Sequence, residues 1–476
     1  MKILMVASEG APYAKTGGLA DVIGALPASL ASKGHEVAVV MPLYRSAERM
    51  VAHADRVFDR MPIRLNPART YLASFRRLKD RGVQIFFVDV PELYDRPELY
   101  GEAGQDYPDN PVRFAVLCRA ALGVIRSLFR PDLVHCHDWQ SGLVGAYMRH
   151  TFRHDPTYTG IATLMTIHNL GYQGQFGRAV LGEVGLDREL FVPSRLEFWG
   201  GVNFLKAGIV YADGVSTVSR GYAKEIQTPE YGFGLDGLLR SRAAQVTGIV
   251  NGVDYLEWSP ETDPFIAAQY SAADLTGKVE CKRDLLRTFG LSQDDLKRPV
   301  IGIVSRFASQ KGFDLIEQIA SQLLQGDVAL TVLGTGEPHY ESVMRSLAEQ
   351  FPDKVAVRVQ FSNELAHKVE AGADIFLMPS RYEPCGLNQI YSLRYGTVPV
   401  VRATGGLDDT IDENVGFKFS GYTGSALMEA LESALETYKN KELWSTLMKN
   451  GMLRDHSWGV AADQYVQIYK SLFPTV

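Results

Sequence analysis

The sequence predicts an α/β protein with two Rossmann-like, doubly wound domains that face each other across a cleft. A chain of 476 residues is too long for one hydrophobic core and suits two domains of about 200 residues each. Short apolar segments alternate with amphipathic ones, which is typical of parallel βαβ units. Each half also has an apolar strand followed by a basic loop with glycine and then a helix, at residues 15–18 and 310–312. Open α/β sheets bind ligands at the carboxyl ends of their strands, so we expect the ligand there.

Short continuous apolar runs predict buried strands, and the amphipathic stretches between them predict helices. In the first half the predicted strands cover residues 3–7, 36–41, 83–88, 133–136 and 163–167, and the predicted helices cover 19–33 and 112–128. In the second half the predicted strands cover 300–304, 328–333, 355–360, 375–378 and 398–401, and the predicted helices cover 313–324, 341–350 and 363–371.

The domain boundary is predicted after residues 249–254, where a strand ends in a turn and a polar stretch follows at 258–263. This divides the chain into an N-terminal domain (1–253), a C-terminal domain (254–455) and a final segment (456–476). The final segment is amphipathic and predicts a helix. Its pattern alone leaves open whether that helix caps the second domain or returns to the first.

Composition excludes several classes of protein. Hydrophobic residues make up 46% of the chain and charged residues 22%, as in ordinary globular proteins, and the net charge of −6 argues against nucleic acid or an anionic membrane as a partner. Four scattered cysteines without C-x-x-C spacing argue against a zinc ribbon and a disulfide scaffold. The first apolar run is too short for a signal peptide, and no run approaches the ~20 residues of a membrane span. A cytoplasmic location is expected.

The segment 377–391 has the layout of a sugar-nucleotide site. An apolar strand leads into a turn that carries one carboxylate, Glu383, just before a helix begins. The first N–H groups of a helix lack intrahelical partners and lie at the positive end of its dipole. We therefore expect the backbone after Gly386 to bind a phosphate while Glu383 accepts hydrogen bonds from the neighbouring sugar. Cys385 lies between Pro384 and Gly386 without a matching His/Asn arrangement, so a turn residue is expected rather than a nucleophile.

Two cations follow another apolar strand. Arg306 and Lys311 lie five residues apart after the strand 300–304. They are predicted to neutralise a diphosphate leaving group, which is the role of a divalent metal in other transferases. No Asp-x-Asp motif lies at a strand end to hold such a metal, so no metal is expected. Together with the Glu383 turn, this loop indicates a glycosyltransferase.

The glycine-bearing loop near the N-terminus is a weaker signal. Gly17 and Gly18 allow close approach of a diphosphate, and Lys15 adds a positive charge. The lysine precedes the glycines, so the loop matches neither the Walker pattern nor G-x-G-x-x-G. An ATPase or a dehydrogenase is therefore disfavoured. A tight turn with a solvated lysine is an equally good interpretation of this loop in isolation.

Polar residues also end two strands of the first half, in His135-Cys136-His137-Asp138-Trp139 and in Ile167-His168-Asn169. Alternate residues of a strand point to opposite faces, which disfavours a zinc site. Hydrogen bonding of sugar hydroxyls by Asp138 and His168, with Trp139 stacked on a sugar ring, is the preferred interpretation. Ordinary buried histidine and tryptophan side chains remain an alternative.

Seven blocks together resemble bacterial glycogen synthase and plant starch synthase. The resemblance covers essentially the whole chain and rests on Lys15-Thr-Gly-Gly-Leu-Ala-Asp21-Val, His135-Cys-His-Asp-Trp139, Ile167-His-Asn169, Val250-Asn-Gly-Val-Asp254, Val304-Ser-Arg-Phe-Ala-Ser-Gln-Lys-Gly312, Pro379-Ser-Arg-Tyr-Glu-Pro-Cys-Gly386 and Thr404-Gly-Gly-Leu407. It implies a B-type glycosyltransferase fold whose C-terminal helix returns to the N-terminal domain. It also implies retaining transfer of glucose from ADP-glucose to the non-reducing end of an α-1,4-glucan, without a metal or another cofactor.

The resemblance also implies roles for individual residues. Lys15, Gly18, Arg306 and Lys311 are expected at the phosphates, Asp138 and His168 at the sugar, Asn251 in the cleft and Glu383 at the transferred glucose. The expected catalytic residues are Glu383, His168, Arg306 and Lys311. The expected substrate-binding residues are Lys15, Gly18, Asp21, Asp138, Trp139, Asn251, Phe361, Cys385, Gly386, Leu387, Asn388, Thr404 and Gly405.

This chain departs from the family pattern at three positions. Asn388 stands where the family usually has Thr, which keeps a hydrogen-bond donor. Cys136 stands where the family has Ala or Asn. Phe361 stands where bacterial relatives stack a Tyr on adenine, which keeps the ring and loses the hydroxyl.

Two mechanisms give retention, a covalent double displacement or attack on the same face as the leaving group. The resemblance favours the second, with Glu383 positioning hydroxyls and the His168 backbone carbonyl near the anomeric carbon. No second carboxylate is found beside Glu383 to form a glycosidase-like pair. Two alternatives remain open for the function: a UDP-glucose-dependent transferase of the same fold, and a catalytically silent protein that binds glucan or nucleotide.

Overall fold

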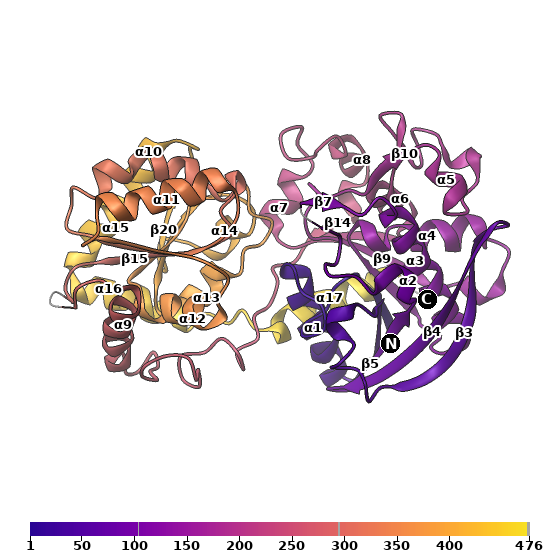
Figure 1. Ribbon diagram of the computed structural model, residues 1–476, viewed down its shortest axis with the longest axis horizontal. Helices are drawn as coiled ribbons and strands as arrows, with labels where there is room; N and C mark the ends of the chain where they lie inside the picture. The colour runs from indigo at the N-terminus through magenta and orange to yellow at the C-terminus, as the bar shows by residue number, and fades with distance from the viewer. Residues whose placement is uncertain (103, 294–295, 474–476) are drawn as a thin grey trace. The chain divides into compact units, whose positions relative to one another are not determined.

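The computed structural model describes residues 1–102, 104–293 and 296–473, and the chain forms two compact units, each with its own sheet, mostly parallel in the first unit and parallel in the second (Figure 1). The first unit consists of Met1–Val218, Ala223–Gly252 and Trp458–Val476. The second consists of Ser219–Tyr222 and Val253–Ser457. Helix α7 (Arg220–Glu225) contains the point at which the chain leaves the second unit and re-enters the first.

In the described part of the first unit, nine strands form one sheet in the order β14-β13-β9-β8-β1-β2-β5-β4-β3. These strands are β1 (Lys2–Val6), β2 (Glu36–Pro42), β3 (Asp55–Asn66), β4 (Arg69–Asp80), β5 (Val83–Asp89), β8 (Leu133–His137), β9 (Ala162–Ile167), β13 (Gly214–Thr217) and β14 (Val246–Gly248). Pairing is parallel from β14 to β5 and antiparallel between β5, β4 and β3. The central strands are buried on both faces, which explains their continuous apolar sequences.

Helices and short strands complete the first unit. The helices are α1 (Gly18–Ser32), α2 (Pro91–Tyr94), α3 (Asn110–Ser127), α4 (Leu143–Ala146), α5 (Val180–Glu183), α6 (Phe204–Tyr211), α8 (Asp236–Ser241) and α17 (Trp458–Ser471), and the short strands are β6 (Gly101–Glu102), β7 (Gln105–Asp106), β10 (Gln175–Gly177), β11 (Glu197–Phe198) and β12 (Gly201–Asn203). Helix α17 packs beside α1 (Figure 1). A Cβ on Gly252 would lie 2.6 Å from the Trp458 Cα atom, so the chain passes very close to the start of α17.

The long hairpin formed by β3 and β4 was not among the predicted elements. Its exposed side carries many charged residues, and only every second residue near its inner part is buried, as at Met61, Ile63 and Leu65. An exposed edge hairpin therefore contains no continuous apolar run. Periodicity of continuous apolar runs therefore does not reveal this hairpin.

In the described part of the second unit, six parallel strands form a sheet in the order β17-β16-β15-β18-β19-β20. The strands are β15 (Val300–Val304), β16 (Ala329–Gly334), β17 (Val355–Val359), β18 (Ile375–Met378), β19 (Val398–Arg402) and β20 (Phe417–Phe419). The helices are α9 (Thr276–Phe289), α10 (Phe313–Leu323), α11 (Pro338–Gln350), α12 (Asn363–Gly372), α13 (Asn388–Arg394), α14 (Gly405–Thr410), α15 (Gly424–Lys439) and α16 (Lys441–Met452). Helices α10 and α11 cover one face, and α9 and α12 the other (Figure 1).

The predicted fold class is confirmed, since each sheet has the doubly wound strand order of a Rossmann-like domain. In each sheet the chain begins at a central strand, runs to one edge and then crosses to the other side. The order reverses between β1 and β8 in the first sheet and between β15 and β18 in the second. Ligands of open α/β sheets bind beside the carboxyl ends of the strands at such a reversal.

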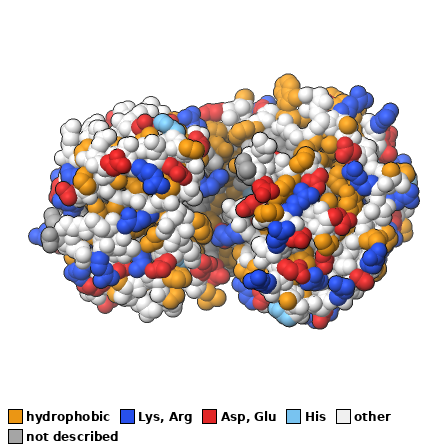
Figure 2. All heavy atoms as spheres, viewed as in Figure 1, with side chains coloured by type: hydrophobic (Ala, Val, Ile, Leu, Met, Phe, Trp, Pro, Cys, Tyr) orange, Lys and Arg blue, Asp and Glu red, His pale blue; other side chains and the backbone are white. Residues whose placement is uncertain are grey.

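The surface fits the charge balance of the sequence. On the face shown in Figure 2, basic and acidic side chains are interspersed. Among the described helices, none is long and apolar enough to cross a membrane.

Candidate active site

An ion pair lies at the strand reversal of the second sheet. Lys311 follows β15 in the short helix η7 (Ser309–Lys311), and Glu383 follows β18. The Lys311 Nζ atom lies 2.6 Å from Glu383 Oε2, and the two side chains are only 18% and 8% exposed. The Ser380 hydroxyl donates to the same carboxylate oxygen at 3.1 Å. Neighbouring parallel strands thus bring together two loops that are 72 residues apart in the chain.

The backbone of the Glu383 turn is held on both sides. The Gly406 N–H donates to the Glu383 carbonyl at 3.1 Å, and the Ser219 hydroxyl donates to the Pro384 carbonyl at 2.5 Å. A Cβ on Gly406 would lie 2.1 Å from the Cys385 carbonyl oxygen, so only glycine fits there. Gly386 has φ +70°, a conformation that also favours glycine. Hydrogen bonds and close backbone contacts therefore fix the conformation of the turn that presents Glu383 in this structure.

Two predicted site residues at this edge have exposed side chains. Arg306, directly after β15, is exposed and has no side-chain partner in the described ranges. Phe361 follows β17 and is 87% exposed, although large apolar side chains are usually buried. Both side chains are thus available for a ligand at the carboxyl edge of the sheet.

The remaining predicted residues of this unit lie around the same loops. Gly386 and Leu387 are half-buried and lead into α13, while Cys385 is buried and 5% exposed. Asn388 is half-buried, and its amide donates to the Val304 carbonyl at 2.7 Å, which ties the start of α13 to the end of β15. Thr404 is buried and precedes Gly405, whose φ is +46° and which begins α14.

In the first unit, the loop after β1 carries Lys15 and Gly18 at the strand reversal. Lys15 Nζ lies 2.6 Å from Asp21 Oδ1, in a pair that is partly exposed to solvent. The buried carboxylate of Glu9, a residue that the sequence analysis missed, accepts hydrogen bonds from the backbone N–H groups of Thr16 at 2.6 Å and Gly17 at 3.3 Å. The loop is therefore fastened by an acid at the end of β1. The only sequence signal for it was a carboxylate directly after an apolar strand.

Asp138 holds the turn that contains His168. It follows β8 and has φ +54°, which is rare for a residue with a side chain. Its Oδ1 accepts the His168 backbone N–H at 2.7 Å. Burial raises the pKa of the Asp138 carboxyl to about 7, although the backbone N–H groups of His168 and Asn169 lower it. In this structure, Asp138 therefore supports His168 directly.

We expect the stability gained by Asp138→Asn to depend on pH. The amide keeps an acceptor for the His168 N–H but has no charge to desolvate. Between about pH 4 and pH 7 the unfolded aspartate loses its proton while the folded one, with a pKa of about 7, retains it. The wild type thus loses stability relative to the variant as the pH rises through this range, and the difference levels above it. The measurement is the Tm of both proteins from pH 4.5 to 8.5; a constant difference would contradict the raised pKa.

The Trp139 side chain lies mainly within the fold. Its side chain is 8% exposed and packs against Phe114, Phe176 and Phe204, with ring centroids 5.0, 5.7 and 6.4 Å away. Gly174 also lies against the ring, because a Cβ there would be 2.4 Å from the indole. The turn after Asp138 directs the indole into this aromatic cluster. Trp139 therefore supports the fold, and its stacking on a sugar ring stays a prediction.

His168 and Asn251 are both nearly buried at the carboxyl edge of the first sheet. His168 follows β9, is 9% exposed, and has its Nε2 3.0 Å from His137 Nδ1. Burial lowers the pKa of His168 to about 3, so its ring is neutral at pH 7. Asn251 follows β14 and is 4% exposed, and its Oδ1 has no hydrogen-bond partner in the part of the chain that the structure describes. Such a buried orphan acceptor is uncommon and suits a ligand donor.

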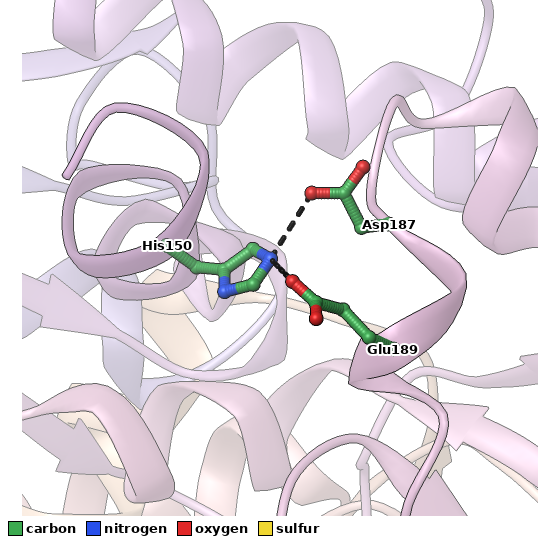
Figure 3. Close-up of side chains that lie close together, drawn as sticks. All are labelled: His150, Asp187 and Glu189. Carbon is green, nitrogen blue, oxygen red and sulfur yellow. Dashed lines mark hydrogen bonds and ion pairs between the residues drawn. The ribbon is translucent and has the colours of Figure 1, made fainter. Parts of the chain in front are cut away.

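The His-Cys-His block is not arranged as a zinc site. Both nitrogens of His135 bond to Tyr469 and Thr166, and His137 bonds to His168. One group elsewhere, in the described ranges, has metal-ligand spacing, with its ligand atoms within 4.8 Å: His150, Asp187 and Glu189 (Figure 3). His150 Nε2 lies 3.1 and 3.2 Å from the two carboxylates, in a charged cluster with both acids largely exposed. This cluster lies next to Arg149, whose guanidinium donates to the Ile161 carbonyl just before β9 begins. The cluster therefore lies toward the amino ends of the strands, away from the carboxyl edge that carries the other site residues.

The comparisons with known proteins cover nearly the whole chain. Residues 2–241 match the family model described as starch synthase catalytic domain, and residues 291–450 match that of glycosyl transferases group 1. A glycogen synthase of Koribacter versatilis is 51% identical over 99% of this chain and 98% of its own. The chain belongs to the glycogen synthase family. The resemblance inferred from the sequence blocks is confirmed, as is the expected enzyme class, a glycosyltransferase.

Other glycogen synthase relatives agree in length and fold. One from Anaeromyxobacter dehalogenans is 46% identical over the full length of both chains. The catalytic domain of starch synthase IV from Arabidopsis thaliana, solved bound to ADP and acarbose, is 33% identical with a TM-score of 0.89 over 99% of each chain. The sucrose-phosphate synthase of Thermosynechococcus elongatus, 19% identical with a TM-score of 0.62, shares the fold alone.

Proposed function

We propose that this glycogen synthase family member transfers glucose from ADP-glucose to the non-reducing end of an α-1,4-glucan, with retention of configuration. The Lys311–Glu383 ion pair at the strand reversal carries the proposal, since it joins a diphosphate-binding cation to a sugar-binding carboxylate in one nearly buried site. The starch synthase neighbour bound to ADP and acarbose supports a nucleotide and a saccharide as the ligands. A cytoplasmic location and the division into 1–253, 254–455 and 456–476 belong to the same proposal.

Cationic side chains, backbone N–H groups and an aromatic ring bind the donor. Phe361, which is 87% exposed, stacks on the adenine, and Arg306 and Lys311 bind the diphosphate. The N–H groups of Gly386, Leu387 and Asn388 contribute to phosphate binding, with Cys385, Thr404 and Gly405 shaping the loops. Glu383 accepts hydrogen bonds from the glucose hydroxyls. The two cations balance the developing negative charge, so no metal is required.

The site residues of the first unit are assigned roles in the same reaction. Lys15 and Gly18 bind the diphosphate, while Asp21 orients Lys15. His168, held by Asp138, and Asn251 bind the sugar. Since the neutral His168 ring has a pKa of about 3, it acts as a hydrogen-bonding group and not as a charged acid.

The reaction breaks the bond between the glucose C1 and the diphosphate oxygen, and ADP leaves with the electron pair. The acceptor O4 hydroxyl attacks C1 on the same face, and its proton passes to the leaving phosphate oxygen. Arg306 and Lys311 stabilise the oxygen as it departs. Glu383 and the His168 carbonyl favour the positive charge that develops on the sugar ring.

The decisive experiment measures ADP release from ADP-glucose in the presence of glycogen, beside UDP release from UDP-glucose. We expect turnover with ADP-glucose, unchanged by EDTA, and a new α-linkage in the proton NMR spectrum of the product. Faster turnover with UDP-glucose would favour the alternative donor. ADP and glucan binding without turnover would identify a silent binding protein instead.

The glycines of the first loop provide a separate prediction. A Cβ on Gly18 would meet no atom within 4 Å, and its φ is not positive, so the chain itself does not require glycine there. Close approach of the donor diphosphate explains the missing side chain. We expect Gly18→Ala to raise the KM for ADP-glucose about tenfold or more while Tm stays unchanged. Gly182→Ala, also without an atom within 4 Å, is the matched control, and an unchanged KM in Gly18→Ala would remove the loop from donor binding.

A further inference from the structure

A chain of buried histidines joins the turn that carries His168 to the C-terminal helix. His137 Nδ1 lies 3.0 Å from His168 Nε2, and the rings of His137 and His135 are 4.0 Å apart. His135 bonds to the Thr166 hydroxyl through Nε2 at 2.6 Å and to the Tyr469 hydroxyl through Nδ1 at 2.9 Å. His135, His137, Thr166 and Tyr469 are all fully buried. The proposed reaction uses His168 but none of these four residues.

Each of the three linked histidines, His135, His137 and His168, carries a single ring proton. Burial lowers the pKa of His168 to about 3 and holds those of His135 and His137 well below their usual value. All three rings are therefore neutral at pH 7, and each exists as one of two tautomers. The contact between His137 and His168 contains one proton, donated by one ring and accepted by the other.

The second nitrogen of His137 decides which ring donates. His137 Nε2 is buried without a hydrogen-bond partner among the described residues. If His168 donated through Nε2–H, His137 would have to carry its proton on Nε2, as an orphaned buried donor. If His137 donates through Nδ1–H, its Nε2 is only an orphaned acceptor. Buried orphan N–H groups are the rarer of the two, which favours donation by His137.

We infer that His137 is a positioning residue that holds His168 as its Nδ1–H tautomer, and that Tyr469 keeps His137 in place by fixing His135. The Nε2 of His168 is then occupied, and its Nδ1–H is left to donate to a ligand oxygen. The His168 ring therefore favours a ligand atom that accepts a hydrogen bond over one that donates. For the identity of that ligand, a sugar oxygen, the inference rests on the proposed function.

The tautomer can be measured directly on the full-length protein without substrate. Long-range proton–nitrogen NMR correlation of protein labelled with ¹⁵N-histidine reports which nitrogen of each of the ten histidines is protonated. The His168 and His137 signals are assigned from their loss in His168→Gln and His137→Phe. We expect Nδ1 to be the protonated nitrogen in both residues. A wild-type His168 protonated on Nε2 would overturn the inference.

Variants test the cause. In His137→Phe, which keeps an aromatic ring on His135, we expect His168 to shift toward Nε2–H and kcat to fall at least tenfold. His137→Asn can place an amide N–H where Nδ1–H was, so it should restore the Nδ1–H signal and much of kcat. The amide of Gln reaches the position of Nε2 instead. If His137→Gln restored kcat and His137→Asn did not, the assigned tautomer would be contradicted.

Tyr469→Phe removes only the hydroxyl that bonds to His135, and we expect it to broaden or split the His137 and His168 signals. Tyr465→Phe is the matched control, since its ring lies 5.5 Å from that of His135 while Tyr469 provides the bonded hydroxyl. Unchanged signals in Tyr469→Phe would contradict the inferred role of Tyr469 in keeping His137 in place. If the tautomer results hold but ADP-glucose is not turned over, the proposed function fails and the inference about His137 stands.

Discussion

Glu383→Gln should lose nearly as much kcat as Glu383→Ala, by about two to four orders of magnitude or roughly 3 to 5 kcal/mol at the transition state. The amide keeps the size of the side chain and one acceptor, but it cannot counter the positive charge that develops on the glucose ring. It also leaves Lys311, now 2.6 Å from the carboxylate, beside a neutral group. The measurement is kcat for both variants in the ADP-release assay.

ADP binding separates loss of charge from loss of the site. The proposed phosphate contacts are backbone N–H groups and cations, so ADP affinity by calorimetry should stay within a few-fold in Glu383→Gln. Glu436→Gln, in an exposed pair with Lys439, is the matched control and should turn over normally. Near-normal turnover in Glu383→Gln would reduce the carboxylate to a positioning group, and wild-type rates in both variants would remove it from the reaction.

Lys311→Met and Arg306→Met should each lower kcat by about two to four orders of magnitude, because the departing diphosphate oxygen loses a preorganised cation. Adding Mg²⁺ should not restore either rate. Methionine keeps an unbranched apolar side chain of similar length, so the neighbouring packing is largely retained. Lys439→Met, at an exposed site with 72% side-chain exposure, is the control for removal of a lysine.

The hydrogen bond between Lys311 and Glu383 also predicts how the losses of kcat combine in double variants. Because Lys311 and Glu383 share a hydrogen bond of 2.6 Å, the double variant Lys311→Met with Glu383→Gln should lose much less than the product of the two single losses. Arg306 has no side-chain partner in the described ranges, so Arg306→Met with Glu383→Gln should combine more nearly multiplicatively. Losses below about tenfold in both single cation variants would exclude them from the mechanism.

Much of the second unit could be predicted from the sequence. Its strands are buried on both faces, so each appears as a short continuous apolar run, and the predicted strand 300–304 coincides with β15. The predicted helix 363–371 differs from α12 by one residue at its end. The loops with Arg306, Lys311 and Glu383 were recognisable because unusual polar residues follow such strands directly.

Contacts between distant segments could not be predicted in the same way. The sequence pattern left two packing partners open for the C-terminal helix, and the structure packs α17 beside α1. Trp139 was expected at a sugar, yet a turn with positive φ at Asp138 precedes it and its ring joins an aromatic cluster. Tyr469 gave no local signal, since its partner His135 lies 334 residues away along the chain.

The sequence by itself determined the apolar and amphipathic periodicity, and with it the two doubly wound sheets and the polar loops at the ends of their strands. Only the tertiary structure decided which of those loops meet. Lys311 reaches Glu383 because β18 pairs directly with β15 after the chain has crossed the sheet. Periodicity reports which face of an element is buried, whereas the order of strands is set by how all the elements pack together.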